Sequence, residues 1–145
     1  MEVESIEETK RCAGLVAEDI KTAQTGNHAL VYGLAGGLGS GKTTFVKFLA
    51  KELGVAKEIT SPSFLIIRNY KTALDNFPNL VHIDAYRLKN SKELAKLGFE
   101  KLINNPENLV IVEWADNVKE IMPNHSRWLQ FEHGEKESER IIRGY

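Results

Sequence analysis

Eight consecutive residues match a phosphate-binding pattern: Gly36-Gly37-Leu38-Gly39-Ser40-Gly41-Lys42-Thr43 has the form G-x-x-x-x-G-K-[ST]. Glycines let backbone N–H groups converge on an anion without steric hindrance from a Cβ atom. Lys42 could then contact the β- and γ-phosphates as a point charge, Thr43 could complete a Mg²⁺ shell, and Thr44 could contact the α-phosphate. The pattern predicts nucleoside triphosphate binding but does not say which triphosphate.

The residues on either side of this pattern predict a strand before it and a helix after it. An apolar run, 29–35, precedes the glycines, and a helical segment, 44–53, follows them. A strand, a glycine-rich turn and a helix in succession distinguish a phosphate site from an ordinary turn. The helix N-terminus adds the positive end of its dipole.

A carboxylate residue stands at the end of each of two later apolar strands. Asp84 ends the run 80–84, and Glu113 follows the run 109–112, whose uniform apolarity predicts a central parallel strand. Ligands of α/β proteins bind at the carboxyl ends of strands, so both side chains are candidates for a metal site or for positioning water. Asp84 could instead cap the next turn. His82 and Asp84, two residues apart, are expected on one face of their strand.

A loop of hydroxyl side chains and a tryptophan are candidates for a switch. Ser61 and Ser63 flank Pro62 and could reach a γ-phosphate or its metal, although a turn fixed by proline is the alternative interpretation. Trp114 follows Glu113 directly. It is either a partner-facing or switch residue, or a part of the core.

The composition excludes several classes of protein. Nineteen Lys and Arg against 20 Asp and Glu give a net charge of −1 over 145 residues, so no global basic field attracts nucleic acid. The single cysteine, Cys12, cannot form an internal disulfide, and the four histidines lack the spacing of a zinc site. No run of apolar residues suits a membrane helix and no signal-peptide pattern is present, which predicts a cytoplasmic location.

The remaining segments predict one domain, 1–145, with an α/β fold. A helix capped by Ser5 should extend to about Ala23, and short helices should follow Ser91 as an N-cap. Two β-hairpins are expected, one near Phe64–Asp84 and a C-terminal one built from 127–131 and 140–143. Together these elements predict a P-loop NTPase domain with a mixed β-sheet flanked by helices.

Four motifs in this order and spacing resemble the TsaE family, and the resemblance covers nearly the whole chain. They are the P-loop segment 38–45, Ser61-Pro62-Ser63-Phe64, the segment 82–87 (His-Ile-Asp-Ala-Tyr-Arg), and Glu113-Trp114. The P-loop is shared with many proteins, whereas the other three together are specific. Gly37, Ser63 and Ala85 depart from the family's usual residues, but none of these changes removes a phosphate or metal ligand.

The resemblance implies an ATPase that acts in forming threonylcarbamoyladenosine at position 37 of tRNAs that read codons beginning with A. Its cofactors would be ATP or ADP and Mg²⁺, and its partners TsaB and TsaD, with no strong direct binding of nucleic acid and no membrane. The resemblance implies that Thr43 and Glu113 bind Mg²⁺ and that Asp84 acts at the γ-phosphate or the metal-water shell. By the same resemblance, Ile6 and Arg140 lie near the base and ribose, Ser61 to Phe64 form the switch, and Trp114 is required.

Other functions remain as alternatives. A GTPase is disfavoured because the chain has no N-K-x-D motif after the P-loop. A small-molecule P-loop kinase needs the same hold on phosphate, but it also needs an arginine-rich lid, and the segment 89–105 contains no arginine. A nucleotide-gated binding module without enzymatic function is the other alternative.

Overall fold

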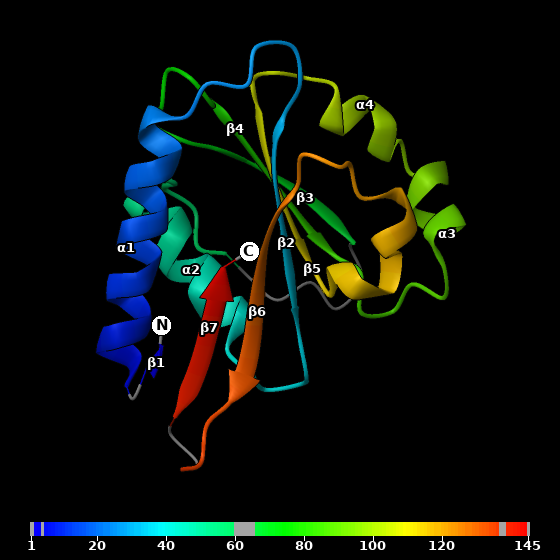
Figure 1. Cartoon of the computed structure of the whole chain (residues 1–145). Coiled ribbons are helices and arrows are strands. Elements are labelled where there is room, and N and C mark those ends of the chain that lie inside the picture. Colours follow the sequence, from blue (N-terminus) through cyan, green and yellow to red (C-terminus); the bar gives the residue numbers. More distant parts are fainter. Residues whose placement is uncertain (1, 4, 60–65, 137–138, 145) are drawn as a thin grey trace.

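A mixed β-sheet forms the centre of the computed structural model, which describes residues 2–3, 5–59, 66–136 and 139–144 (Figure 1). The described strands are β1 (Glu2–Val3), β2 (Leu30–Gly36), β3 (Ile67–Lys71), β4 (Asn79–Asp84), β5 (Asn108–Glu113), β6 (Arg127–His133) and β7 (Arg140–Gly144). In space, these seven strands follow the order β1-β7-β6-β2-β5-β4-β3. The P-loop strand β2 is therefore central.

Parallel pairs form the middle of the sheet and antiparallel pairs form its edges. β2 pairs in parallel with β5 and with β6, and β5 pairs in parallel with β4. The antiparallel pairs are β3 with β4, β6 with β7, and β1 with β7. The predicted mixed sheet and both hairpins are confirmed, although Phe64 itself lies outside the described residues.

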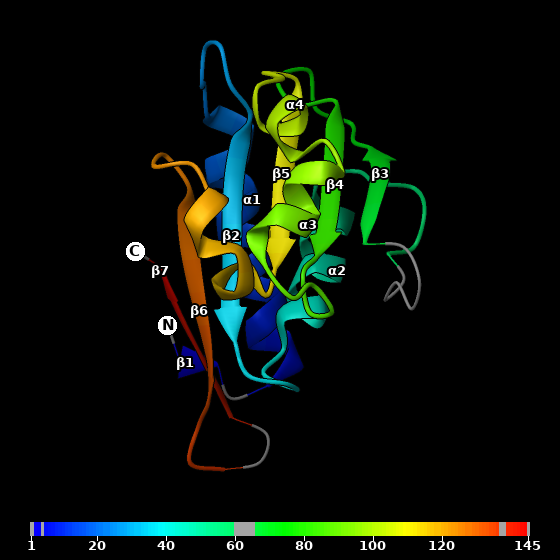
Figure 2. The same cartoon turned by 90° about the vertical axis from the view of Figure 1, so that its right-hand side faces the viewer.

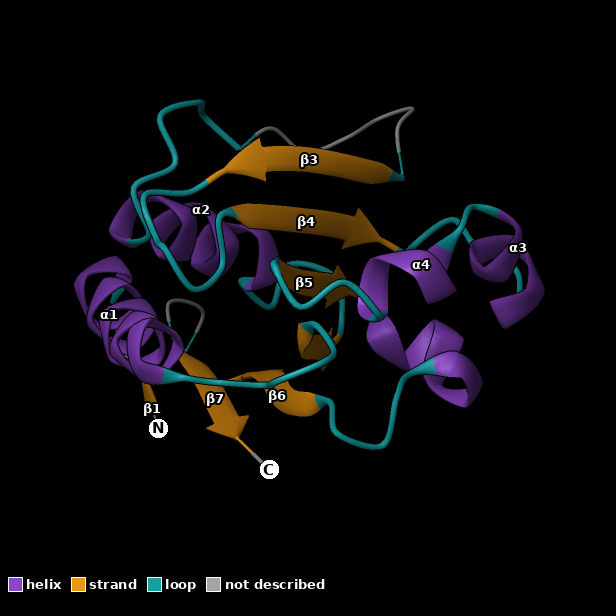
Figure 3. Cartoon of the chain, turned by 90° about the horizontal axis from the view of Figure 1, so that it is seen from above, coloured by secondary structure: helices purple, strands orange, loops and turns teal. Residues whose placement is uncertain are grey.

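Helices cover both faces of the sheet. α1 (Ile6–Thr22) and α2 (Lys42–Glu52) lie together on one face, as Figures 1 and 3 show. The other face carries α3 (Ser91–Lys96), α4 (Phe99–Ile103) and the 3₁₀ segment η1 (Ala115–Ile121), all in front of the sheet in Figure 2. The P-loop helix α2 and the first helix thus share one side.

Side-chain alternation divides the core into two layers. Leu30, Tyr32 and Leu34 of β2 belong to the layer under α1 and α2, whereas Val31 faces the other helices. All six residues of β5 are buried, as expected for a central parallel strand covered on both faces. The same alternation directs His82, Asp84 and Glu113 toward the α2 side, because Leu80, Leu109 and Ile111 belong to that layer.

The first helix begins as predicted. The Ser5 side chain accepts a hydrogen bond from the backbone N of Glu8 at 3.3 Å, and the helix ends at Thr22 with Ala23 as its C-cap. Cys12, on this helix, is buried in the core.

The prediction of an N-cap at Ser91 is wrong by one residue. Asn90 has the extended backbone of a cap, and its side-chain oxygen accepts from the N of Glu93 at 3.3 Å. Asn and Ser cap equally well, so their order in the sequence could not decide between them. Ser91 is the first helical residue, and its hydroxyl donates to Glu120 of η1 at 3.2 Å.

Within the described part of the chain, no helix combines the length and the apolarity that are needed to cross a membrane.

Candidate functional site

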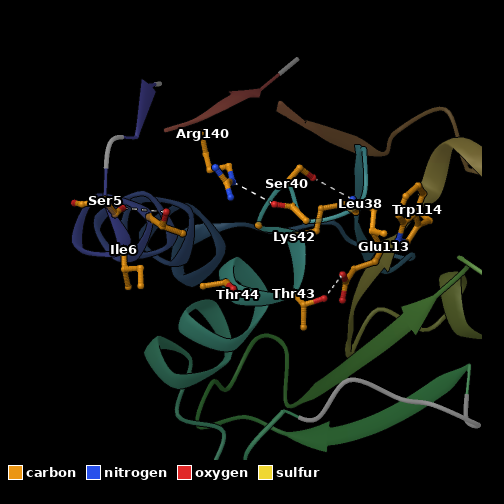
Figure 4. A pocket seen from close by; sticks show the side chains of 13 residues that line it. Ser5, Ile6, Leu38, Ser40, Lys42, Thr43, Thr44, Glu113, Trp114 and Arg140 are labelled. Carbon is orange, nitrogen blue, oxygen red and sulfur yellow. Dashed lines mark hydrogen bonds between the residues drawn. The ribbon is translucent and has the colours of Figure 1, made fainter. Parts of the chain in front are cut away.

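A cavity of about 510 Å³ opens beside the turn between β2 and α2 (Figure 4). Its volume is in the range of small-molecule sites. Four parts of the chain surround it: the start of α1, the P-loop, the end of β5 and the start of β7. The lining residues are Ser5, Ile6, Thr9, Leu38, Gly39, Ser40, Gly41, Lys42, Thr43, Thr44, Glu113, Trp114 and Arg140.

Backbone geometry favours glycine at three positions of the turn, Gly36, Gly39 and Gly41, because φ is positive at each. Gly36 has φ 141°, and a Cβ atom there would lie 2.2 Å from the carbonyl oxygen of Phe131 on β6. Gly41 has φ 98° and precedes the first residue of α2. These glycines let the turn pass close to β6 and then enter the helix. Gly37, in contrast, has open space around it, so the family's larger residue would fit there without a clash.

Lys42 is held inside the turn and is only 4% exposed. Its ammonium group donates to the carbonyl oxygens of Gly36 at 2.7 Å and Gly37 at 2.8 Å, and to the Ser40 hydroxyl at 3.2 Å. Burial lowers the pKa of Lys42, and the charge of Glu113 opposes that shift. Gly36 and Gly37 thus orient the lysine through their carbonyls and do not themselves line the cavity.

Glu113 is buried, 2% exposed, at the end of β5. The Thr43 hydroxyl donates to its Oε1 at 2.7 Å, and the His82 ring places Nε2 2.5 Å from its Oε2. Each carboxylate oxygen therefore has its own donor, one from α2 and one from β4. The predicted pair of Thr43 and Glu113 is brought together; Figure 4 shows the contact.

Asp84 stands beside Glu113 but differs in its surroundings. The two residues are register partners at the ends of the parallel strands β4 and β5. Asp84 is partly exposed, its Oδ1 accepts from the backbone N of Tyr86 at 3.0 Å, and it does not line the cavity. Burial raises the pKa of its carboxyl group, an effect that the Tyr86 hydrogen bond opposes. The structure therefore confirms that Asp84 begins the next turn, while its role at a metal or at an attacking water stays a prediction.

Trp114 covers the lysine. It is the only non-glycine residue with positive φ, 58°, within the described ranges. Its ring centroid lies 4.0 Å from Lys42 Nζ, a cation–π contact, and its ring packs on Tyr86 with centroids 4.8 Å apart. Trp114 is partly exposed and also packs against the core layer under η1. The core contact is therefore confirmed, while the role of Trp114 as a switch or partner-facing residue stays a prediction.

The opposite end of the cavity contains the residues that the resemblance placed near base and ribose. Ile6 lines it and is 66% exposed, and Arg140 donates from Nε to the carbonyl oxygen of Gly39 at 3.2 Å. His133, which the sequence did not single out, has Nε2 3.1 Å from the carbonyl oxygen of Leu38. The last hairpin thus supports the P-loop at two successive residues.

The site residues were not all located. Ser61 and Ser63 lie outside the described residues, so their proposed role as a switch stays a prediction. His82 was placed on the Asp84 face by alternation, but its contact with Glu113 was missed because the neighbouring strand was unknown. No group of three or more His, Cys, Asp or Glu side chains gathers as a metal cluster in the ranges that the structure describes.

The fold and the turn together define a P-loop α/β domain. The chain belongs to the TsaE family: the model of that family, described as "Threonylcarbamoyl adenosine biosynthesis protein TsaE", matches residues 3–142.

Relatives and a solved structure agree with this membership. The chain is 38% identical to the tRNA threonylcarbamoyladenosine biosynthesis protein TsaE of Rickettsia felis, over 80% of this chain and 62% of the relative. It is 37% identical to the Bacillus subtilis protein of the same description, over 81% of this chain and 66% of the relative. The crystal structure of Bacillus subtilis YdiB superimposes with a TM-score of 0.72 at 31% identity, covering 98% of this chain and 80% of that one. The match thus spans less than two thirds of these two curated relatives.

Proposed function

We propose that this protein binds ATP with Mg²⁺ in the P-loop cavity, hydrolyses it, and thereby serves the formation of threonylcarbamoyladenosine on tRNA. The observation that carries the proposal is the Thr43–Glu113 pair at the P-loop, at 2.7 Å, in a chain of the TsaE family. The relatives are described as tRNA threonylcarbamoyladenosine biosynthesis proteins.

Mg²⁺ suits the oxygen donors gathered at Glu113. A hydroxyl that donates its proton to a carboxylate keeps its lone pairs for a cation, and Mg²⁺ prefers carboxylate and hydroxyl oxygens. Thr43 and Glu113 would hold the ion, which when bound would neutralise charge on the β- and γ-phosphates. This donor set fits the metal that the family implies.

The chain's own groups would act on the triphosphate as follows. The backbone N–H groups of 38–43 and the start of α2 would bind the phosphate oxygens. Lys42 lines the cavity and would exchange its carbonyl partners for the β- and γ-phosphates. Thr44 would contact the α-phosphate. Asp84, partly exposed, would act at the γ-phosphate or at the water shell of the metal.

The cavity beyond the phosphates would hold the nucleoside. Ile6 offers an exposed apolar surface for the base, and Arg140 offers a planar guanidinium beside the P-loop. Thr9 and Ser5 add hydroxyls to the same wall. ATP or ADP is therefore the proposed ligand.

The energy of hydrolysis would be used by other proteins. A net charge of −1 gives no field for tRNA, so strong direct tRNA binding is not expected. We propose that the chain acts with TsaB and TsaD on position 37 of tRNAs reading codons that begin with A, in the cytoplasm. Ser61, Ser63 and Trp114 would transmit the nucleotide state, since Trp114 contacts Lys42 directly.

The test measures ATP binding and turnover with and without TsaB and TsaD. Slow turnover alone, faster turnover with both partners, and poor tRNA binding are expected. Lys42→Ala should lose binding or turnover, whereas Lys47→Ala, which changes an exposed lysine of the same helix, should not. Undiminished turnover in Lys42→Ala would overturn the P-loop assignment. Binding without any turnover in the active mixture would instead favour a nucleotide-gated module.

A further inference from the structure

A buried histidine that lies outside the cavity contacts Glu113, the proposed metal ligand. His82 is 1% exposed in the middle of β4, and its Nε2 lies 2.5 Å from Oε2 of Glu113. His82 does not line the cavity, whereas Glu113 does. Any effect of the ring on the cavity must therefore act through that carboxylate.

The contact fixes the tautomer of the ring. A carboxylate accepts hydrogen bonds, so Nε2 carries the proton and donates it to Glu113. The other nitrogen, Nδ1, is buried and makes no hydrogen bond among the described residues. An apolar side chain at position 82 would bury no nitrogen without a hydrogen bond. The packing of the core alone therefore does not explain why this residue is a histidine.

Two hydrogen-bond donors, one at each carboxylate oxygen, fix the plane of the Glu113 carboxylate. Thr43 comes from α2 and binds Oε1, while His82 comes from β4 and binds Oε2. A glutamate has three side-chain torsions, and a single hydrogen bond would leave the carboxylate free to rotate about the last of them. With both donors present, Oε1 stays beside the Thr43 hydroxyl at the cavity wall.

We infer that His82 is a positioning residue that holds Glu113 in the orientation needed to bind a divalent cation together with Thr43. The inference rests on the proposed function, in which Thr43 and Glu113 form the Mg²⁺ site. Hydrogen bonds to metal-binding side chains commonly change metal affinity about 10- to 100-fold when they are lost.

Two amide substitutions test the hydrogen-bond donor of His82 independently of its imidazole ring. The amide nitrogen of Gln lies as many bonds from Cβ as Nε2 of histidine, and that of Asn as many as Nδ1. His82→Gln should therefore still donate to Glu113, while His82→Asn should not reach it. The Mg²⁺ concentration for half-maximal ATP binding should rise about tenfold or more in His82→Asn and stay near the native value in His82→Gln. Metal-free ADP affinity should be the same in both.

The control removes packing from the same strand without touching Glu113. Val81 faces the opposite core layer, so Val81→Ala should lower the melting temperature and leave the Mg²⁺ midpoint unchanged. A readout independent of metal and nucleotide is the NMR signal of the His82 Nε2–H proton, which should be downfield and protected from exchange in the native chain. Its absence would overturn the inference even if both variants failed to fold.

The outcomes distinguish the inference from the proposed function. Glu113→Gln should raise the Mg²⁺ midpoint; if it does not, the metal assignment itself fails. If Glu113→Gln raises the midpoint but His82→Asn does not, only the positioning role of His82 is wrong. Equal losses in His82→Gln and His82→Asn would also overturn it, because the amide donor would then have restored nothing.

Discussion

The ends of β4 and β5 lie side by side and both carry a carboxylate, yet the two are held very differently. Glu113 is buried and takes a side-chain hydrogen bond on each oxygen, from Thr43 and His82. Asp84 is partly exposed and accepts from the backbone of Tyr86. A fixed carboxylate suits a ligand whose geometry must be ready before binding, and an adjustable one suits a group that follows the reacting phosphate. This difference supports the proposed roles, a metal ligand for Glu113 and a group acting at the γ-phosphate or its water for Asp84.

The largest effect is expected at the adjustable carboxylate. Asp84→Asn should lower ATP turnover about 100-fold, because a neutral amide cannot accept a proton or hold an attacking water as a carboxylate does. ADP affinity should change by less than about twofold, since Asp84 does not line the cavity. Steady-state turnover with TsaB and TsaD, together with ADP titrations, measures both quantities. A large loss of ADP affinity would show that Asp84 binds the ligand.

Substitution of Glu113, the fixed carboxylate, should change the Mg²⁺ dependence of ATP binding. Glu113→Gln should raise the Mg²⁺ requirement for ATP binding about tenfold or more, because the charge is lost and the new amide competes for the Thr43 hydroxyl. Asp84→Asn is the matched control and should leave this requirement nearly unchanged. Binding titrations at graded Mg²⁺ give the two midpoints. The reverse ranking would exchange the roles of the two side chains.

Truncation to alanine should lower the stability of the fold more at Glu113 than at Asp84. Glu113→Ala leaves the buried His82 ring and the partly buried Thr43 hydroxyl without their acceptor and should cost about 1–3 kcal/mol, several degrees of melting temperature. Asp84→Ala removes a partly exposed acceptor and should cost less than about 1 kcal/mol. Thermal unfolding without nucleotide compares the variants. Equal costs would mean that Glu113 is not held as tightly as its contacts indicate.

The smallest expected effect is on the pH dependence of stability. Burial raises the pKa of Asp84 above its ordinary 3.8, so the folded state binds this proton more tightly than the unfolded state. Stability should therefore increase as pH falls through the raised pKa toward 3.8, relative to Asp84→Asn, which lacks the group. The effect should be small because Asp84 is partly exposed. Urea midpoints of both proteins from about pH 7 to about pH 4 measure it; a relative decrease over this window would contradict the direction.

The sequence predicted those parts of the site that depend on local order. The P-loop follows from a glycine pattern between a strand and a helix, and Glu113 from its place at the end of an apolar strand. The pairing of Thr43 with Glu113 came from the family resemblance, and the structure brings the two side chains together.

Contacts across the sheet could not be predicted in the same way. His82 meets Glu113 only because β4 and β5 are neighbours, and His133 reaches Leu38 across 95 positions of sequence. Strand order decides both contacts, and periodicity carries no information about strand order. β1, with two residues, and the 3₁₀ segment η1 were missed because they are too short or too irregular to give a period.

The support of the P-loop by the last hairpin has a consequence for biosynthesis. His133 and Arg140 reach the carbonyls of Leu38 and Gly39, and Gly36 packs against Phe131. A ribosome finishes the glycine turn long before it makes β6 and β7. During that interval β2 first lacks both of its parallel neighbours, β5 and β6, and later lacks β6 alone, and the nascent turn lacks both supporting donors. The P-loop is thus made early and gains its last supporting contacts late, so we expect an emerging chain to bind nucleotide only after its sheet is complete.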